Sequence, residues 1–218
     1  MTRFLVGLAI LFFSFVTNAM TELQSVPPHG QVQFDAVGRP SMLKIKGEAI
    51  GAIANLSVTD HNLNGTIKFD LNALKTGIDL RDEHMKDKYL QVKQGDNAIA
   101  TLTFTDFPIP LSWTAAAAKI PSWTFRAMLH LHGVDREITG NYSIGSNKMD
   151  TIAKFDIKLS DFKIDIPTYL GVKVADIVNV VVSFPEMKLT ERSVPQTNGP
   201  KVDAAAASAA APAKVKKK

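Results

Sequence analysis

The strongest constraint on the fold of this chain is a two-residue alternation of apolar and polar side chains that recurs from residue 31 to residue 189. In one such run, Ile67 and Phe69 alternate with Lys68 and Asp70. Successive side chains of a β-strand point to opposite faces of the sheet, so this pattern gives a strand one buried face and one face in water. It is typical of antiparallel strands, which need only one covered face.

Comparable runs recur along the chain, at residues 101–105, 125–132, 155–160 and 178–184. Groups of Gly, Pro, Asn and Asp separate the runs. Turn-forming residues between short alternating runs predict an all-β sandwich or antiparallel barrel, here with about eight strands. We also expect a short helix at Leu80–Tyr89, capped by Asp79, because this stretch is rich in helix-forming residues. One domain accounts for the length.

The N-terminal segment differs from the rest in composition. Met1–Ala19 has a positive start, an apolar stretch from Phe4 to Val16 and a small residue at its end, which predicts a signal peptide at residues 1–19. A membrane anchor is the alternative, but this apolar stretch would span only about 20 Å as a helix, against ~30 Å of hydrocarbon. We therefore expect an exported protein, periplasmic where the cell has two membranes, with a folded domain at residues 20–193.

Residues 194–218 are rich in Ala and Lys and lack the large apolar side chains of a core, so we expect a disordered tail there. Five Lys and one Asp of this tail account for the formal net charge of +4, which leaves the body close to neutral. A near-neutral body does not fit a nucleic-acid-binding protein. We expect at most weak electrostatic contact of the tail with an anionic membrane or cell-wall polymer.

Two groups of residues could carry chemistry. His130 and His132 are two apart in one alternating run, so both rings would leave the same face of a strand, and a third ligand would complete a zinc site. Such a site would make the protein a metal-dependent hydrolase or isomerase that uses His130 and His132, and we keep this as an alternative function. Arg81, Asp82 and His84 are the second group. They indicate an acid–base cluster, a connector held by an Arg81–Asp82 pair, or ligand contacts at a barrel mouth.

No residues suggest a nucleophile for catalysis. The chain has no Cys and no G-x-S-x-G motif. The lack of Cys also excludes metal sites built on thiolates. We expect neither enzyme activity nor a cofactor or metal.

Two motifs carry a resemblance to a known family. Leu74–Met85 contains Thr-Gly followed by Arg-Asp-Glu-His, and Leu129–Val134 ends in His-Gly-Val. In this order and spacing the motifs resemble those of the YceI family, exported β-barrel proteins that bind lipids. Met85 and His130 stand where the family usually has Leu and Thr. The resemblance extends from about residue 32 to residue 189.

The resemblance implies a lipocalin-like antiparallel β-barrel, a monomer or homodimer, whose lumen carries or stores a polyisoprenoid, an isoprenoid quinone or a similar long lipid. It also makes Arg81, Asp82 and His84 candidates for the barrel rim or for head-group contacts. By alternation, the candidate lumen residues are Ile67, Phe69, Leu102, Phe104, Leu129, Leu131, Phe155, Ile157 and Val180. The same positions could form a closed core instead, because small barrels can be filled by their own side chains.

Overall fold

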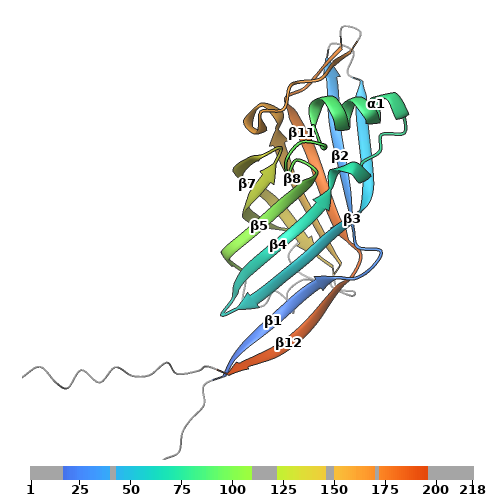
Figure 1. Ribbon diagram of the computed structural model, residues 1–218. Helices are drawn as coiled ribbons and strands as arrows, with labels where there is room; N and C mark the ends of the chain where they lie inside the picture. Colours follow the sequence, from blue (N-terminus) through green and yellow to red (C-terminus); the bar gives the residue numbers. More distant parts are fainter. Residues whose placement is uncertain (1–16, 40–42, 110–121, 146–149, 170–171, 196–218) are drawn as a thin grey trace, which may run out of the picture.

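Eight antiparallel strands close into a barrel in the computed structural model, which describes residues 17–39, 43–109, 122–145, 150–169 and 172–195 (Figure 1). Each strand is hydrogen-bonded to its two neighbours in the wall, and the pairing of β2 (Gly30–Arg39) with β3 (Lys44–Thr59) closes the barrel. This confirms the predicted all-β barrel. In their order around the barrel, the strands are β3 (Lys44–Thr59), β4 (Asn62–Asp70), β5 (Ile99–Pro108), β6 (Trp123–Leu131), β7 (Val134–Ile144), β8 (Thr151–Lys158), β11 (Ile177–Phe184) and β2 (Gly30–Arg39).

Two further strands form an arm at one end of the barrel. β1 (Thr17–Ser25) and β12 (Met187–Pro195) pair with each other along their whole length, and β1 also pairs with β3. The length of β3 makes this possible, because its first half pairs with β2 and Asn55–Thr59 pair with β1. Figure 1 shows β1 and β12 extending beyond β3 and β4. We call this end of the barrel the arm end.

The opposite end carries a helical connector and is called the helix end here. The connector between β4 and β5 contains η1 (Leu71–Ala73), α1 (Asp79–Glu83) and a π-helical turn, η2 (His84–Tyr89). The predicted helix is therefore present. The expected cap is wrong, because Ile78 occupies the N-cap position without a side-chain hydrogen bond and Asp79 is the first helical residue.

Three smaller elements complete the helix end. η3 (Leu159–Phe162) follows β8, and the short strands β9 (Thr168–Tyr169) and β10 (Val172–Val174) lead to β11. β10 pairs with β9 and with the last residues of β2. The connector, the start of β3 and the β9–β10 pair therefore gather at one end of the barrel.

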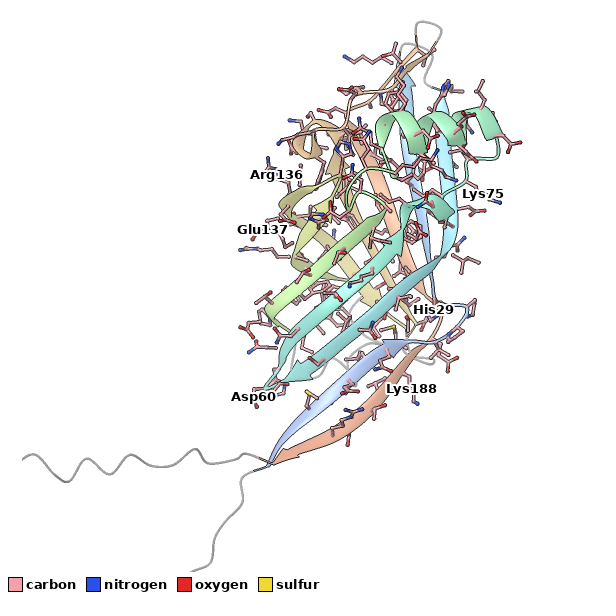
Figure 2. The ribbon with its side chains drawn as sticks, viewed as in Figure 1. His29, Asp60, Lys75, Arg136, Glu137 and Lys188 are labelled. Carbon is pink, nitrogen blue, oxygen red and sulfur yellow. The ribbon has the colours of Figure 1, made fainter. Side chains whose placement is uncertain are left out.

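The alternation in the sequence becomes the inner and outer face of the wall. In β6, Phe125 and Leu129 are buried, whereas Arg126 and Met128 are exposed. Charged residues of other elements, such as Lys75, Arg136 and Glu137, lie on the outer surface (Figure 2). The wall thus has an apolar inner face and a polar outer face, as its sequence pattern predicts.

The predicted segment boundaries fall partly outside the described residues. Most of the predicted signal peptide and of the predicted tail lies there. The paired backbone of the arm extends to Thr17 and Pro195. Within the described part of the chain, no helix is both long and apolar enough to cross a membrane.

Candidate ligand-binding cavity

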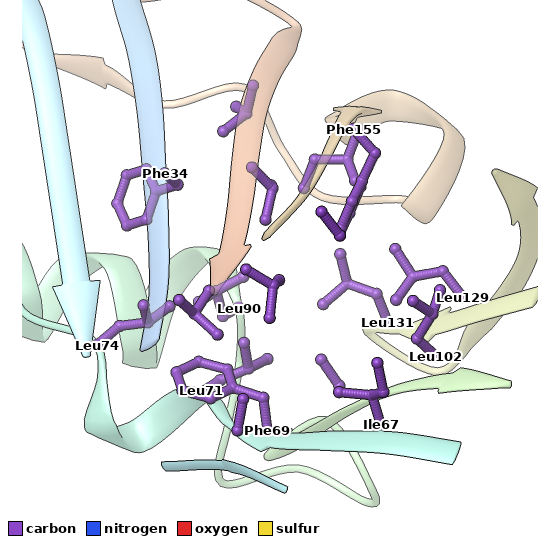
Figure 3. Close-up of a pocket in the computed structure, with 18 of the residues that line it drawn as sticks. Phe34, Ile67, Phe69, Leu71, Leu74, Leu90, Leu102, Leu129, Leu131 and Phe155 are labelled. Atoms are coloured by element: carbon purple, nitrogen blue, oxygen red, sulfur yellow. The ribbon is translucent and has the colours of Figure 1, made fainter. Parts of the chain in front are cut away.

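A cavity of about 950 Å³ occupies the interior of the barrel. Its lining is apolar apart from a few hydroxyl groups and three basic side chains. Figure 3 shows apolar side chains from opposite walls, among them Phe34, Phe69 and Leu129, pointing toward a shared open space. Pockets for small ligands have volumes of roughly 300–1,000 Å³. The cavity is therefore large enough for an elongated lipid chain.

All of the predicted lumen residues line this cavity. They are Ile67, Phe69, Leu102, Phe104, Leu129, Leu131, Phe155, Ile157 and Val180. The barrel is therefore not filled by its own side chains, which was the alternative for these positions. That these residues contact a lipid remains a prediction.

Two glycines help to keep the cavity open. Gly47 of β3 is paired with Phe34 of β2, and Gly140 of β7 is paired with Phe125 of β6. A Cβ atom on Gly47 would lie 2.2 Å from Cε1 of Phe34, and one on Gly140 would lie 2.6 Å from Cε1 of Phe125. The two rings therefore occupy the space that the glycines leave at the wall, and less of each ring extends into the cavity.

The cavity opens at the helix end. Among the described residues, the exposed ones that line the cavity belong to the connector, to β9 or to the position just before β3, and they are Leu43, Ile78, Leu80, His84, Lys88 and Thr168. By contrast, described lining residues near the arm end, such as Leu23, Val58 and Met187, are buried. We call the opening surrounded by the six exposed residues the mouth.

Thr76 joins Arg81 and Asp82 beside the mouth. Asp82 is 9 % exposed, and its Oδ1 accepts hydrogen bonds from the backbone N–H of Thr76, at 2.8 Å, and from the Thr76 hydroxyl. Arg81 donates from Nε to the Thr76 hydroxyl oxygen at 2.8 Å and from Nη2 to the Thr76 carbonyl at 2.7 Å. The expected direct Arg81–Asp82 pair is therefore replaced by a link through Thr76.

The candidate rim residues occupy different positions around the mouth. Arg81 and His84 line the cavity, whereas Asp82 does not. Thr76, which the motif also contains, lines the cavity. Asp82 thus holds the start of α1 in place, and Arg81 and His84 are the members of the predicted group that can reach a ligand.

His130 and His132 do not form a common site. β6 ends at Leu131, and His132 begins the following turn with a φ of 52°, so the two rings do not share a strand face. The Nδ1 atom of His132 lies 3.0 Å from the carbonyl oxygen of Phe162. Among the described residues, no group of three His, Asp or Glu side chains is arranged to hold a metal ion.

His130 instead lies between two carboxylates outside the cavity. Its Nδ1 is 2.7 Å from Asp135 Oδ1, and its Nε2 is 2.9 Å from Asp96 Oδ2. The hydrogen bond to Asp135, helped by the negative charge of Asp96, raises the pKa of His130 above its usual 6.5 despite partial burial. His130 therefore connects the segment before β5 to the β6–β7 hairpin.

Several residues that line the cavity are not among those predicted from the sequence. Phe34 belongs to an alternating run at residues 31–36, so its position could have been predicted by the same rule. Met85, Lys88 and Leu90 come from the connector, where a two-residue period does not apply. The spacing of Arg81, Met85 and Lys88 is that of one helix face, a signal that was available in the sequence.

Comparison with known proteins identifies the family. A search of curated proteins finds no match. Among the solved structures that share the fold are a polyisoprenoid-binding domain from Saccharophagus degradans implicated in plant cell wall breakdown, and BcnA of Burkholderia cenocepacia. The first is 16% identical, with a TM-score of 0.53, over 80% of this chain and 98% of that chain. The second is 15% identical, with a TM-score of 0.54, over 71% of this chain and 94% of that chain. The YceI-like domain model matches residues 24–185, and the chain therefore belongs to the YceI-like domain family.

Proposed function

We propose that this protein is an exported carrier or storage protein that holds a long apolar lipid, of the polyisoprenoid or isoprenoid-quinone type, in its barrel. The observation that carries the proposal is the apolar cavity of about 950 Å³, whose exposed lining residues, among those that the structure describes, surround the mouth. Moving apolar surface from water into such a cavity is favourable by roughly 25 cal/mol per Å². A lipid chain gains this energy without any chemical step, so the proposed function is binding and requires no catalysis.

Two further observations support the proposal. The chain belongs to the YceI-like family, and the structurally similar domain from Saccharophagus degradans binds polyisoprenoid. The signal-peptide pattern of Met1–Ala19 supports export, and a periplasmic location in a cell with two membranes. In this proposal the protein acts as a monomer or homodimer, has no nucleic-acid partner and has at most a weak electrostatic contact through its Lys-rich tail.

Native mass spectrometry of protein purified from its own host tests the proposal directly. We expect a co-purified lipid, bound at one molecule per chain. Added prenyl alcohols should bind more tightly as they lengthen, until the cavity is full. At roughly 0.3 kcal/mol per non-hydrogen atom, each five-carbon unit adds about 1.5 kcal/mol, or about tenfold in affinity. Reproducible absence of lipid, together with no uptake of prenyl chains, would refute the proposal.

Neighbouring residues of β11 provide a matched pair of variants. Val180 lines the cavity, whereas Val181 follows it on the strand and does not. Val180→Phe should reduce lipid uptake because the larger side chain occupies part of the lumen. Val181→Phe adds the same volume outside the cavity and should leave uptake unchanged. Equal uptake by both variants would show that the lipid lies elsewhere.

A metal assay separates this function from metal-dependent catalysis. The protein should contain no stoichiometric transition metal, because His130 and His132 bind different partners. His130→Ala combined with His132→Ala should retain the bound lipid. About one tightly held metal ion per chain in the unchanged protein would contradict the proposal.

A further inference from the structure

The charge of the cavity lining is one-sided. Its side chains include Arg81, His84 and Lys88, but no Asp or Glu of the described chain lines the cavity. Arg and Lys are charged at neutral pH, and a histidine ring can donate a hydrogen bond in either protonation state. Such a set of groups favours an anionic ligand over a neutral one, because hydrogen bonds between charged partners are stronger than those to a neutral acceptor.

These three basic residues lie on one side of the helical connector. They occupy positions i, i+3 and i+7 of α1 and η2, which is the spacing of neighbours on a helix face. All three lie at the mouth, where His84 and Lys88 are exposed and Arg81 is half-buried. A ligand that emerges from the cavity on this side therefore meets all three in succession.

The contacts of Arg81 and Lys88 within the described part of the protein leave the positive charges of both side chains unneutralised. Two nitrogens of Arg81 bind Thr76, which fixes the guanidinium beside the mouth, and Nη1 makes no hydrogen bond to any of the described residues. Lys88 has no ion pair among the described residues, and its Nζ lies 5.4 Å from the centre of the Tyr89 ring. Among the described residues, the Lys88 ammonium group therefore has no anionic partner at the mouth.

The carboxylates of the connector do not reach the cavity. Asp82 binds Thr76, and Asp87 pairs with Lys93 at 2.8 Å. Asp79 and Glu83 are exposed and do not line the cavity. The connector is therefore mixed in charge along its sequence, but it presents only basic side chains to the cavity.

We propose that the mouth binds the phosphate head group of a lipid whose apolar chain fills the barrel, with Arg81, His84 and Lys88 as the head-group residues. This inference rests on the proposed function and narrows its ligands to anionic lipids, which should bind more tightly than quinones or free prenols. Arg provides directed hydrogen bonds to phosphate oxygens, and Lys provides a compact positive charge. The head group then lies at the helix end, and the chain extends toward the arm end.

The test compares two ligands with the same chain and different head groups. Geranylgeranyl phosphate and geranylgeraniol share one apolar chain, so their ratio of Kd values isolates the head group. We expect the phosphate to bind at least about tenfold more tightly, the effect of one charge-assisted hydrogen bond worth ~1.4 kcal/mol. The preference should shrink as NaCl rises from about 50 mM to about 500 mM, because salt screens exposed charges.

Two Lys variants of one connector supply the matched comparison. Lys88→Gln should lower the preference for phosphate about fivefold or more, and His84→Gln should lower it as well. Lys86 lies two residues earlier in η2 and does not line the cavity. Lys86→Gln removes the same charge and should leave the preference unchanged. Circular dichroism on each variant verifies that the barrel is intact.

The outcomes separate this inference from the function on which it rests. If both ligands bind with equal affinity, or if Lys86→Gln and Lys88→Gln act alike, the head-group site is refuted and the lipid carrier stands. If neither ligand binds, both the carrier and the head-group site are refuted. Phosphate preference that is lost in Lys88→Gln and retained in Lys86→Gln supports both.

Discussion

Replacement of Asp82 tests whether its link to Thr76 holds the connector in place. Asp82 is 9 % exposed and accepts two hydrogen bonds, from the N–H and the hydroxyl of Thr76. Asp82→Ala would leave the Thr76 N–H without its partner, and an unsatisfied buried polar group costs about 1–3 kcal/mol. Asp82→Asn retains an acceptor for this N–H but loses the charge, so it should cost about 1 kcal/mol.

Urea denaturation and thermal unfolding measure this cost. For a chain of this length, 1 kcal/mol corresponds to a fall in Tm of roughly 2–4 °C. Asp82→Ala should therefore lower Tm by about 2–12 °C. Glu83→Ala is a suitable control, because Glu83 is exposed in the same helix. Its free energy of unfolding should change by no more than about 0.5 kcal/mol.

A double-mutant cycle with Thr76 identifies the partner. Thr76→Val removes the hydroxyl that Asp82 and Arg81 share. Asp82→Ala should therefore cost less in the Thr76→Val background than in the unchanged protein, with a coupling of about 0.5–3 kcal/mol. Full additivity, or an Asp82→Ala variant as stable as its Glu83→Ala control, would refute the role assigned to this link.

Three other predictions concern the cavity, the pH dependence of stability and export. Gly47→Ala should push the Phe34 ring into the lumen and reduce lipid occupancy in native mass spectra, whereas unchanged occupancy would contradict the role of this glycine in keeping the cavity open. The pKa of His130 is higher in the folded than in the unfolded state because protonated His130 binds Asp135. This contact therefore stabilises the fold fully below pH 6.5, and its contribution is lost as pH rises through the folded-state pKa. The protein should therefore exceed its His130→Gln variant in stability by more at about pH 6 than at about pH 9, and a pH-independent difference would count against the Asp135 contact. Mass spectrometry of the protein from its host should find cleavage after Ala19, and an intact N-terminal segment would disprove export by a cleaved signal.

The sequence alone was sufficient for the fold class and for the inner face of most strands. Side chains of a strand alternate by geometry, so a residue such as Leu129 can be assigned to the lumen once its strand is recognised. The helical connector was also predictable within a residue, but its cap was not. Asp79 has the right residue type for a cap, yet the backbone of Ile78 takes that position.

Only the tertiary structure decided that the barrel is open and where it opens. The space beside Phe34 depends on Gly47 in the neighbouring strand, and no local pattern specifies which residues face each other across two strands. In the same way, Asp82 and Arg81 both bind Thr76 because the chain folds back between Thr76 and α1, and these contacts fix Arg81 beside the mouth. The sequence determined which faces are apolar, since that depends on local periodicity. The size of the cavity and the charge at its mouth depend on contacts between distant segments, and these exist only in the closed barrel.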